Sequence, residues 1–248
     1  RWLRRHRWQA SALAAGVASL AIGLGVALVH AAEASRQRDV ALREQARLEA
    51  VQQAVFVMFG DASERGGREA TAAAVLDGAA RRIVEGYERD PAAGAPVLHA
   101  LGELYFLVTD YAAAEPLLRR LAEADPRKVD PSLVAAGQYD LAQVRLRTGD
   151  AASAATLLAQ AQAFWQTDAS RWESRLVDSR LLQAQLLRQA GDGDGAITLL
   201  REALPRRIAI SGAHHRETGV FHNNLGVALF AAGDLDGARS SFAAAREV

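Results

Sequence analysis

Charged residues are absent from one stretch near the start of the chain and recur regularly through the rest. Residues 8–30 (WQASALAAGVASLAIGLGVALVH) contain no Asp, Glu, Lys or Arg. A helix rises about 1.5 Å per residue, so this stretch would extend about 34 Å and cross a hydrocarbon core about 30 Å thick. Inside a bilayer the backbone must satisfy its own hydrogen bonds. The pattern therefore predicts a single transmembrane helix over residues 8–30.

The flanks of this stretch predict its orientation. Residues 1–7 (RWLRRHR) carry four Arg and no acid, whereas residues 31–45 mix both signs of charge. Because positive flanks favour the cytoplasmic side, we expect residues 1–7 to form a cytoplasmic stub and the chain from about residue 33 to be extracytoplasmic. This predicts a single-pass protein of an inner or plasma membrane. The chain opens with Arg1, which suggests a piece of a longer protein.

Two other interpretations of residues 8–30 stay open. A signal peptide would end at Val29-His30-Ala31, but its apolar core usually spans only about 7–15 residues. A buried core helix fits such a long uncharged run less well. Small residues at every fourth position would let two membrane helices approach closely and form a homodimer, although an Ala- and Gly-rich chain also produces such a face by chance. The residues of this packing face are Ala15, Ser19, Gly23 and Ala27.

Amphipathic patterns begin after the uncharged run. Residues 31–69 are predicted to form a juxtamembrane helix and a loop, because apolar residues at Leu48, Val51 and Val55 follow helical spacing and glycines then interrupt the pattern. Thr71 can cap a helix from residue 72 to about residue 89, which should end before Pro91. Residues 70–94 match the second half of the unit that follows them, and we interpret them as a degenerate half-repeat.

The region 95–248 repeats one helix–turn–helix pattern four times. Small residues, such as Gly102 and Gly226, lie where the two helices of a unit should approach, and large residues such as Leu118 should fill the space between units. Internal periods of this length are typical of solenoids of stacked helix pairs. The turns recur at intervals of 40, 42 and 42 residues, at Thr109, Gly149, Gly191 and Gly233.

This order of small, glycine and large positions resembles the tetratricopeptide repeat. The interval of about 42 residues, instead of the standard 34, is similar to the lengthened repeats of kinesin light chains and their bacterial relatives. Residues 211–229 (SGAHHRETGVFHNNLGVAL) are similar to the segment that joins repeats in that variant. The resemblance implies an all-α solenoid, in which Ala79, Ile83 and Pro91 would belong to the half-repeat at its N-terminal end.

Composition agrees with an all-α protein and narrows its chemistry. The formal net charge is zero and 6% of residues are aromatic, so nothing favours binding to nucleic acid. Runs of alternating β-branched residues between turn signals, which would indicate strands, are missing. The chain has no Cys, which excludes disulfides, thiolate metal sites and cysteine nucleophiles.

The order of features along the whole chain also resembles that of a known class of proteins. A basic RWLRRHRW, an Ala-rich apolar run, a charged helix and AVFVMFGDASERGGREATAAAVLDGAARRI, all before long repeats, look like the C-terminal half of bacterial membrane-anchored serine/threonine protein kinases. The resemblance implies an upstream kinase domain that uses ATP and Mg²⁺. This chain carries no Gly-rich loop, His-Arg-Asp or Asp-Phe-Gly motif, so we expect it to be non-catalytic and free of cofactors.

Two candidate metal sites are weak. Residues 191–195 (GDGDG) fall on a predicted inter-helix turn, and no Glu follows at the distance that an EF-hand requires. His214 and His215 fall in a loop, and His222 occupies a position where such repeats carry an apolar residue. Zinc sites need three or four ligands fixed in geometry. We therefore predict no metal site.

The first helix of each unit should line a surface that binds a protein or peptide partner. The alternative is a structural spacer whose exposed positions bind nothing. Three functions stay open: the sensor and interaction region of a serine/threonine kinase in signal transduction, a membrane-anchored repeat scaffold, or a transmembrane transcription regulator. The predicted partner-binding groove comprises His99, Glu103, Phe106, Tyr139, Gln143, Leu181, Gln185, Arg188 and Asn223.

Overall fold

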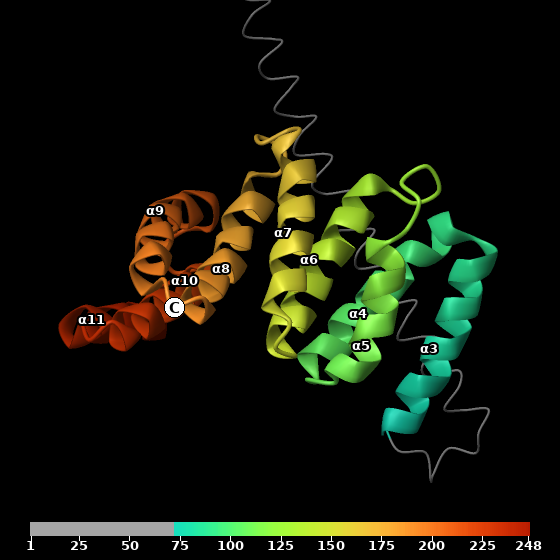
Figure 1. Ribbon diagram of the computed structural model, residues 1–248, viewed down its shortest axis with the longest axis horizontal. Coiled ribbons are helices and arrows are strands. Elements are labelled where there is room, and N and C mark those ends of the chain that lie inside the picture. The colour runs from blue at the N-terminus through green and yellow to red at the C-terminus, as the bar shows by residue number, and fades with distance from the viewer. Residues whose placement is uncertain (1–71) are drawn as a thin grey trace, which may run out of the picture. The chain divides into compact units, whose positions relative to one another are not determined.

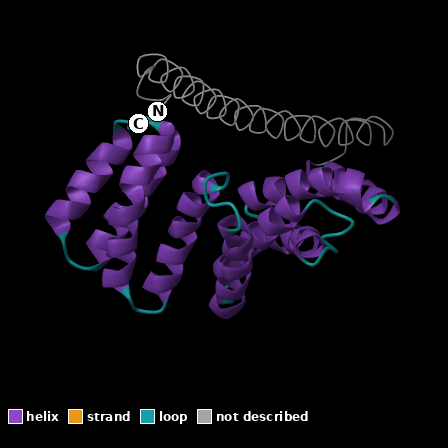
Figure 2. Cartoon of the chain, turned by 90° about the horizontal axis from the view of Figure 1, so that it is seen from above, coloured by secondary structure: helices purple, strands orange, loops and turns teal. Residues whose placement is uncertain are grey.

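The computed structural model describes residues 72–248, and this part of the chain is helical without strands (Figures 1 and 2). It belongs to one compact unit, Ala50–Val248. Each helix packs against the next, and alternate helices α4, α6, α8 and α10 also contact one another in sequence. The described helices are α3 (Ala72–Arg89), α4 (Pro91–Leu107), α5 (Tyr111–Ala122), α6 (Pro131–Arg147), α7 (Ala151–Gln166), α8 (Glu173–Gln189), α9 (Gly193–Ser211), α10 (Arg216–Ala231) and α11 (Leu235–Arg246).

One turn chemistry joins the helices of each pair. An Asp begins the second helix, and its carboxylate accepts a hydrogen bond from the backbone N–H three residues later, as with Asp150 and Ser153 at 3.1 Å. The Asp backbone N–H reaches back to a carbonyl five residues earlier, which satisfies the end of the first helix. The capping residues are Asp110, Asp150, Asp192 and Asp234.

The residue before each Asp adopts a positive φ, at all four predicted turn positions. Gly149, Gly191 and Gly233 have φ of 92°, 88° and 84°, a region that glycine enters without strain. Thr109 has φ of 62° and bears a β-branched side chain there. The left-handed region costs such a residue about 1–2 kcal/mol. The turn between α4 and α5 is therefore the strained member of the set.

Close approaches between helices explain the predicted small residues. A Cβ added to Gly102 of α4 would lie 2.5 Å from Cδ2 of Leu118 in α5, and one added to Gly226 of α10 would lie 2.7 Å from Cε1 of Phe242 in α11. These distances are well inside van der Waals contact, so the glycines let each pair of helices pack at their observed separation. The small and large positions of the sequence pattern thus correspond to real contacts.

Buried side chains form a core that runs from α3 to α11. One cluster, which includes Leu98, Leu101 and Leu121, lies among α3 to α6 and the loop after α5, and another, which includes Leu200 and Phe221, lies among α8 to α11. An aromatic cluster lies between them: the rings of Tyr139 and Trp165 are 5.6 Å apart, and those of Phe164 and Trp172 are 5.7 Å apart. The described part of the chain is therefore an all-α, solenoid-like stack.

The single-pass membrane localisation predicted from the sequence is not supported by the structure. Within residues 72–248, none of the helices is both long enough and apolar enough to cross a membrane, because each carries charged or polar positions beside its buried ones. The cytoplasmic stub at 1–7, the predicted transmembrane helix at 8–30 with its packing face Ala15, Ser19, Gly23 and Ala27, and the juxtamembrane segment at 31–69 lie outside the described residues.

Candidate protein-binding groove

The nine residues predicted to line a partner-binding surface all lie on α4, α6, α8 or α10, the first helices of their pairs. The structure does not gather them into one site. Gln185 and Arg188 line a groove among α6, α8 and α10, while His99, Glu103 and Gln143 lie in a separate polar cluster between α4 and α6. The remaining four have other surroundings.

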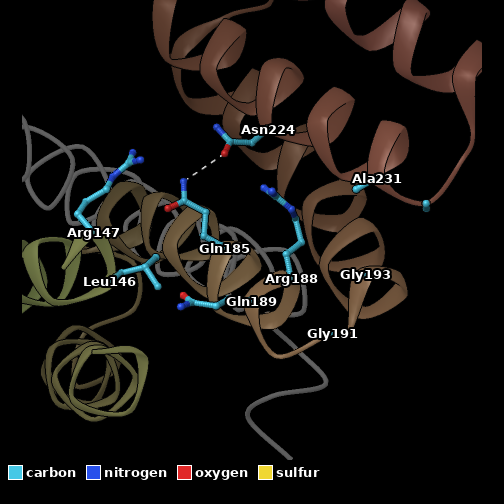
Figure 3. Close-up of a pocket in the computed structure, with 10 residues that line it drawn as sticks. Leu146, Arg147, Gln185, Arg188, Gln189, Gly191, Gly193, Asn224 and Ala231 are labelled. Carbon is cyan, nitrogen blue, oxygen red and sulfur yellow. Dashed lines mark hydrogen bonds between the residues drawn. The ribbon is translucent and has the colours of Figure 1, made fainter. Parts of the chain in front are cut away.

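The groove among α6, α8 and α10, hereafter the inner groove, has a volume of about 710 Å³ (Figure 3). At its centre the side-chain amide of Gln185 donates a hydrogen bond to Oδ1 of Asn224, at 3.2 Å. Arg147, at the end of α6, and Arg188, on α8, lie on either side of this pair (Figure 3). The residues that line the inner groove are Leu146, Arg147, Gln185, Arg188, Gln189, Gly191, Gly193, Asn224, Ala231 and Ala232.

The inner groove carries positive charge. Two of its described lining residues are arginines and none is an acid. Asp192 lies between two lining glycines, but its carboxylate accepts a hydrogen bond from the backbone N–H of Gly195 at the start of α9. Amide groups can both donate and accept hydrogen bonds, whereas guanidinium groups only donate. The surface therefore suits a ligand with a polar backbone and an anionic group.

The polar cluster between α4 and α6 has the opposite charge character. Nε2 of His99 lies 2.6 Å from Oδ2 of Asp140, and the amide of Gln143 donates to Oδ1 of the same carboxylate at 3.0 Å. His99 is 9% exposed. Burial opposes the charge on its ring, but the hydrogen bond with Asp140 and the negative charges of Asp140 and Glu103 outweigh burial and raise the pKa of His99.

The other predicted groove residues lie elsewhere. Tyr139 packs edge-on against Trp165, and its hydroxyl donates a hydrogen bond to the carbonyl of Asp178 at 3.4 Å. Burial raises the pKa of this hydroxyl. Leu181 packs against the core around Phe221. Phe106 lies 5.6 Å from the ring of Tyr111. Asn223 borders a second groove of about 540 Å³ between α10 and α11. These four residues lie on first helices of their pairs but do not line the inner groove.

A buried arginine that the sequence pattern did not reveal joins α8, α9 and α10. Arg207 of α9 is 0% exposed. Its guanidinium contacts Asp178 at 2.7 Å and Glu217 at 2.6 Å, and it also donates to the carbonyl of Ser174 at 3.0 Å. Its Nε has no hydrogen-bond partner. Pro205-Arg206-Arg207 reads as a solvated basic run, so nothing local distinguishes Arg207 from its neighbour.

Comparison with known proteins supports the fold. Residues 178–248 match the family model described as the tetratricopeptide repeat. The structure resembles BtubC (BKLC) from P. vanneervenii, with a TM-score of 0.55, 23% identity, and coverage of 69% of this chain and 70% of that one. It also resembles nearly identical TPR-like repeats from a protein described as a kinesin light chain of Podosopora anserina, with a TM-score of 0.55, 18% identity, and coverage of 81% and 93%.

No curated protein matches the sequence of the chain. At these identities the structural similarities show the fold alone. The segment 178–248 matches the tetratricopeptide repeat, and stacked helix pairs of this kind present extended surfaces. Neither the family match nor these structures carries evidence for a kinase domain or a membrane-spanning part. One of these structural neighbours is described as TPR-like repeats of a kinesin light chain, the family that the repeat spacing resembles.

Proposed function

We propose that this protein is a protein-interaction scaffold whose inner groove binds an extended, acidic segment of a partner. The observation that carries the proposal is the placement of Arg147 and Arg188 on either side of the Gln185–Asn224 amide pair, in a groove of about 710 Å³ with no acid among its described lining residues. A peptide backbone would exchange hydrogen bonds with the amides, and an acidic side chain would pair with a guanidinium.

The groove fits a peptide better than a small metabolite. It extends across three helices and its walls are surface side chains, of which Arg147, Gln189 and Ala231 are exposed. Small-molecule sites are mostly apolar cavities that bury most of the ligand. Helix-pair repeats instead present long surfaces to which extended segments bind. The acidic preference follows from the two arginines, and it gives specificity and association rate more than affinity.

The experiment is a display selection of random peptides on the full chain, followed by fluorescence anisotropy of a selected peptide. We expect enrichment of Asp and Glu, and a Kd that rises about tenfold or more in Arg147→Ala/Arg188→Ala, since a charge-assisted hydrogen bond contributes about 1.5–3 kcal/mol. The matched control is Arg201→Ala/Arg206→Ala, which removes the same charge from exposed positions of α9 outside the groove.

Two results would contradict this proposal. One is a selection that enriches no acidic residues. The other is an equal loss of affinity in both double variants, which would mean that net charge, and not the groove, attracts the peptide. Binding should also weaken with added salt, because the two arginines lie in a groove that is open to solvent.

A narrower hypothesis is that these repeats are the interaction region of a serine/threonine kinase in a signalling pathway. It is supported only by the order of features along the whole chain described above, and it needs a catalytic domain encoded before Arg1. Sequencing the gene upstream of Arg1 tests it directly. A His-Arg-Asp and an Asp-Phe-Gly motif would support the kinase, whereas a DNA-binding helix or an immediate start codon would favour a transcription regulator or a scaffold without catalytic activity.

A further inference from the structure

Three metal-ligating side chains converge between α4 and α6. His99 and Glu103 are four residues apart on α4, so they lie on the same face of that helix one turn apart. Asp140 faces them from α6. One ligand atom of each residue, an imidazole nitrogen and two carboxylate oxygens, lies within 4.8 Å of the other two. Among the described side chains this is the only such group.

The donor set suits a first-row divalent cation. One imidazole and two carboxylates are borderline to hard ligands, of the kind that Zn²⁺, Mn²⁺ and Fe²⁺ accept, whereas Mg²⁺ and Ca²⁺ prefer oxygen alone. Zinc binds such ligands at about 2.0–2.2 Å, and three protein ligands leave a coordination position for water. One ion could contact all three ligand atoms once the side chains rotate to that distance, since each atom already lies within 4.8 Å of the other two.

The surroundings of the cluster would orient the ligands. His99 and Asp140 have side chains that are only 11% and 14% exposed, so competition from bulk water is limited. The amide of Gln143 donates to Oδ1 of Asp140 at 3.0 Å, which leaves Oδ2 directed at His99. A hydrogen bond of this kind to the non-ligating oxygen fixes a metal-binding carboxylate.

A simpler interpretation is a structural His99–Asp140 hydrogen bond that joins two neighbouring repeats. That interpretation explains two of the three residues, since the Nε2–Oδ2 distance of 2.6 Å is an ordinary charge-assisted contact. It does not require the carboxylate of Glu103 to lie beside that pair. The carboxylate of Glu103, one turn from His99, is what turns a hydrogen-bonded pair into a three-ligand group, and it is therefore the residue that distinguishes the two interpretations.

We propose that His99, Glu103 and Asp140 form a binding site for one Zn²⁺-like divalent cation, which links the first helices of two successive repeats. This site is separate from the inner groove and does not depend on the proposed partner. Because its ligands come from two helices, the bound ion stabilises their contact and adds to the stability of the folded chain by mass action.

The test is isothermal titration of Zn²⁺ into the full chain after treatment with a chelator. We expect one saturable site, and an affinity that falls by about tenfold or more in Glu103→Gln and in His99→Ala, because three ligands are few and each is needed. Zn²⁺ should also raise the thermal unfolding temperature of the wild type but not of Glu103→Gln. The Glu103→Gln variant keeps the His99–Asp140 hydrogen bond, and its unfolding temperature without metal provides the baseline against which its response to Zn²⁺ is measured.

The matched control is His214→Ala/His215→Ala, which removes two exposed histidines from the turn before α10. It should bind Zn²⁺ with wild-type affinity. The proposal is overturned if the wild type shows no saturable site, if Glu103→Gln binds as tightly as the wild type, or if the control loses the site instead. In the second case the His99–Asp140 contact is a structural hydrogen bond only.

Discussion

The α4–α6 pair and the α8–α10 pair use equivalent positions of successive repeats for opposite chemistry. Between α4 and α6, two carboxylates surround a buried imidazole. Between α8 and α10, an amide pair lies in an open groove beside Arg188, with Arg147 contributed by α6. The repeat determines which positions face the neighbouring unit, and the side chains there determine whether the contact is closed and acidic or open and basic.

The two pairs also differ in how they balance buried charge. The α4–α6 cluster has one titratable base against two acids, whereas among α8, α9 and α10 the permanently charged Arg207 contacts the two acids Asp178 and Glu217. A guanidinium stays charged at any pH that a folded protein experiences, but an imidazole does not. This contrast implies that the α8–α10 region depends more on a fixed ion network than the α4–α6 region does.

Arg207→Ala should have the largest effect on this contrast. Removal of the guanidinium leaves Asp178 and Glu217 without their cation, and because their side chains are 28% and 51% exposed the cost should be about 1–3 kcal/mol, less than for a fully buried pair. We expect urea unfolding to show a loss of that size. The control is Arg206→Ala, whose side chain is exposed, and it should change stability by no more than about 0.5 kcal/mol. Similar losses in both variants would mean that the network is not stabilising.

A pH experiment sharpens the same comparison. Burial, with repulsion from Glu217, outweighs the attraction of Arg207 and Arg175 and raises the pKa of Asp178 to about 6. The folded chain therefore holds a proton between about pH 4 and 6 that the unfolded chain releases, so this group makes stability fall as pH rises through that window. A shift of this size corresponds to about 2–3 kcal/mol.

The measurement is the difference in the free energy of unfolding between the wild type and Asp178→Asn, taken at about pH 4.5 and again at about pH 7.5. We expect this difference to decrease towards higher pH. Asp150 is the control of opposite sign, because hydrogen bonds from Ser153 lower its pKa, so the wild type should gain relative to Asp150→Asn as pH rises through the acidic range. A difference for Asp178 that increases with pH would contradict the assigned shift.

The sequence predicted the architecture because its signals are local. Glycine or a substitute before an Asp, small residues one or two turns away and a large residue in the next helix recur in every unit, and the structure places a positive φ or a close contact at these points. All nine predicted groove residues lie on first helices. The surroundings of Tyr139 and Leu181 could not be derived from the sequence, because these residues differ from exposed positions only in how neighbouring helices pack.

The sites depend on residues that are far apart in the chain. Nε2 of His99 meets Asp140 across 41 positions, and Gln185 meets Asn224 across 39, so spacing alone could not pair them. The predicted set contains Asn223, which borders the groove between α10 and α11, whereas its neighbour Asn224 lines the inner groove. Histidines adjacent in sequence attracted attention as metal ligands, yet His215 accepts a hydrogen bond from the backbone N–H of Glu217 at the start of α10.

The smallest expected effects compare the two glycines at helix crossings. In Gly102→Ala the new methyl group would meet Leu118, which is 0% exposed and surrounded by core, so the clash should cost about 1–3 kcal/mol. In Gly226→Ala it would meet the ring of Phe242, which is only half-buried and can turn towards solvent. We expect a cost of less than about 1 kcal/mol there, partly offset by the better helix propensity of Ala.

Urea unfolding of both variants tests this order, and the double variant Gly102→Ala/Leu118→Ala should lose less stability than the sum of the losses in its two single variants. Equal costs at the two positions would mean that the α10–α11 crossing is packed as tightly as the α4–α5 crossing, and that the ends of the repeat region do not differ in their tolerance of added volume.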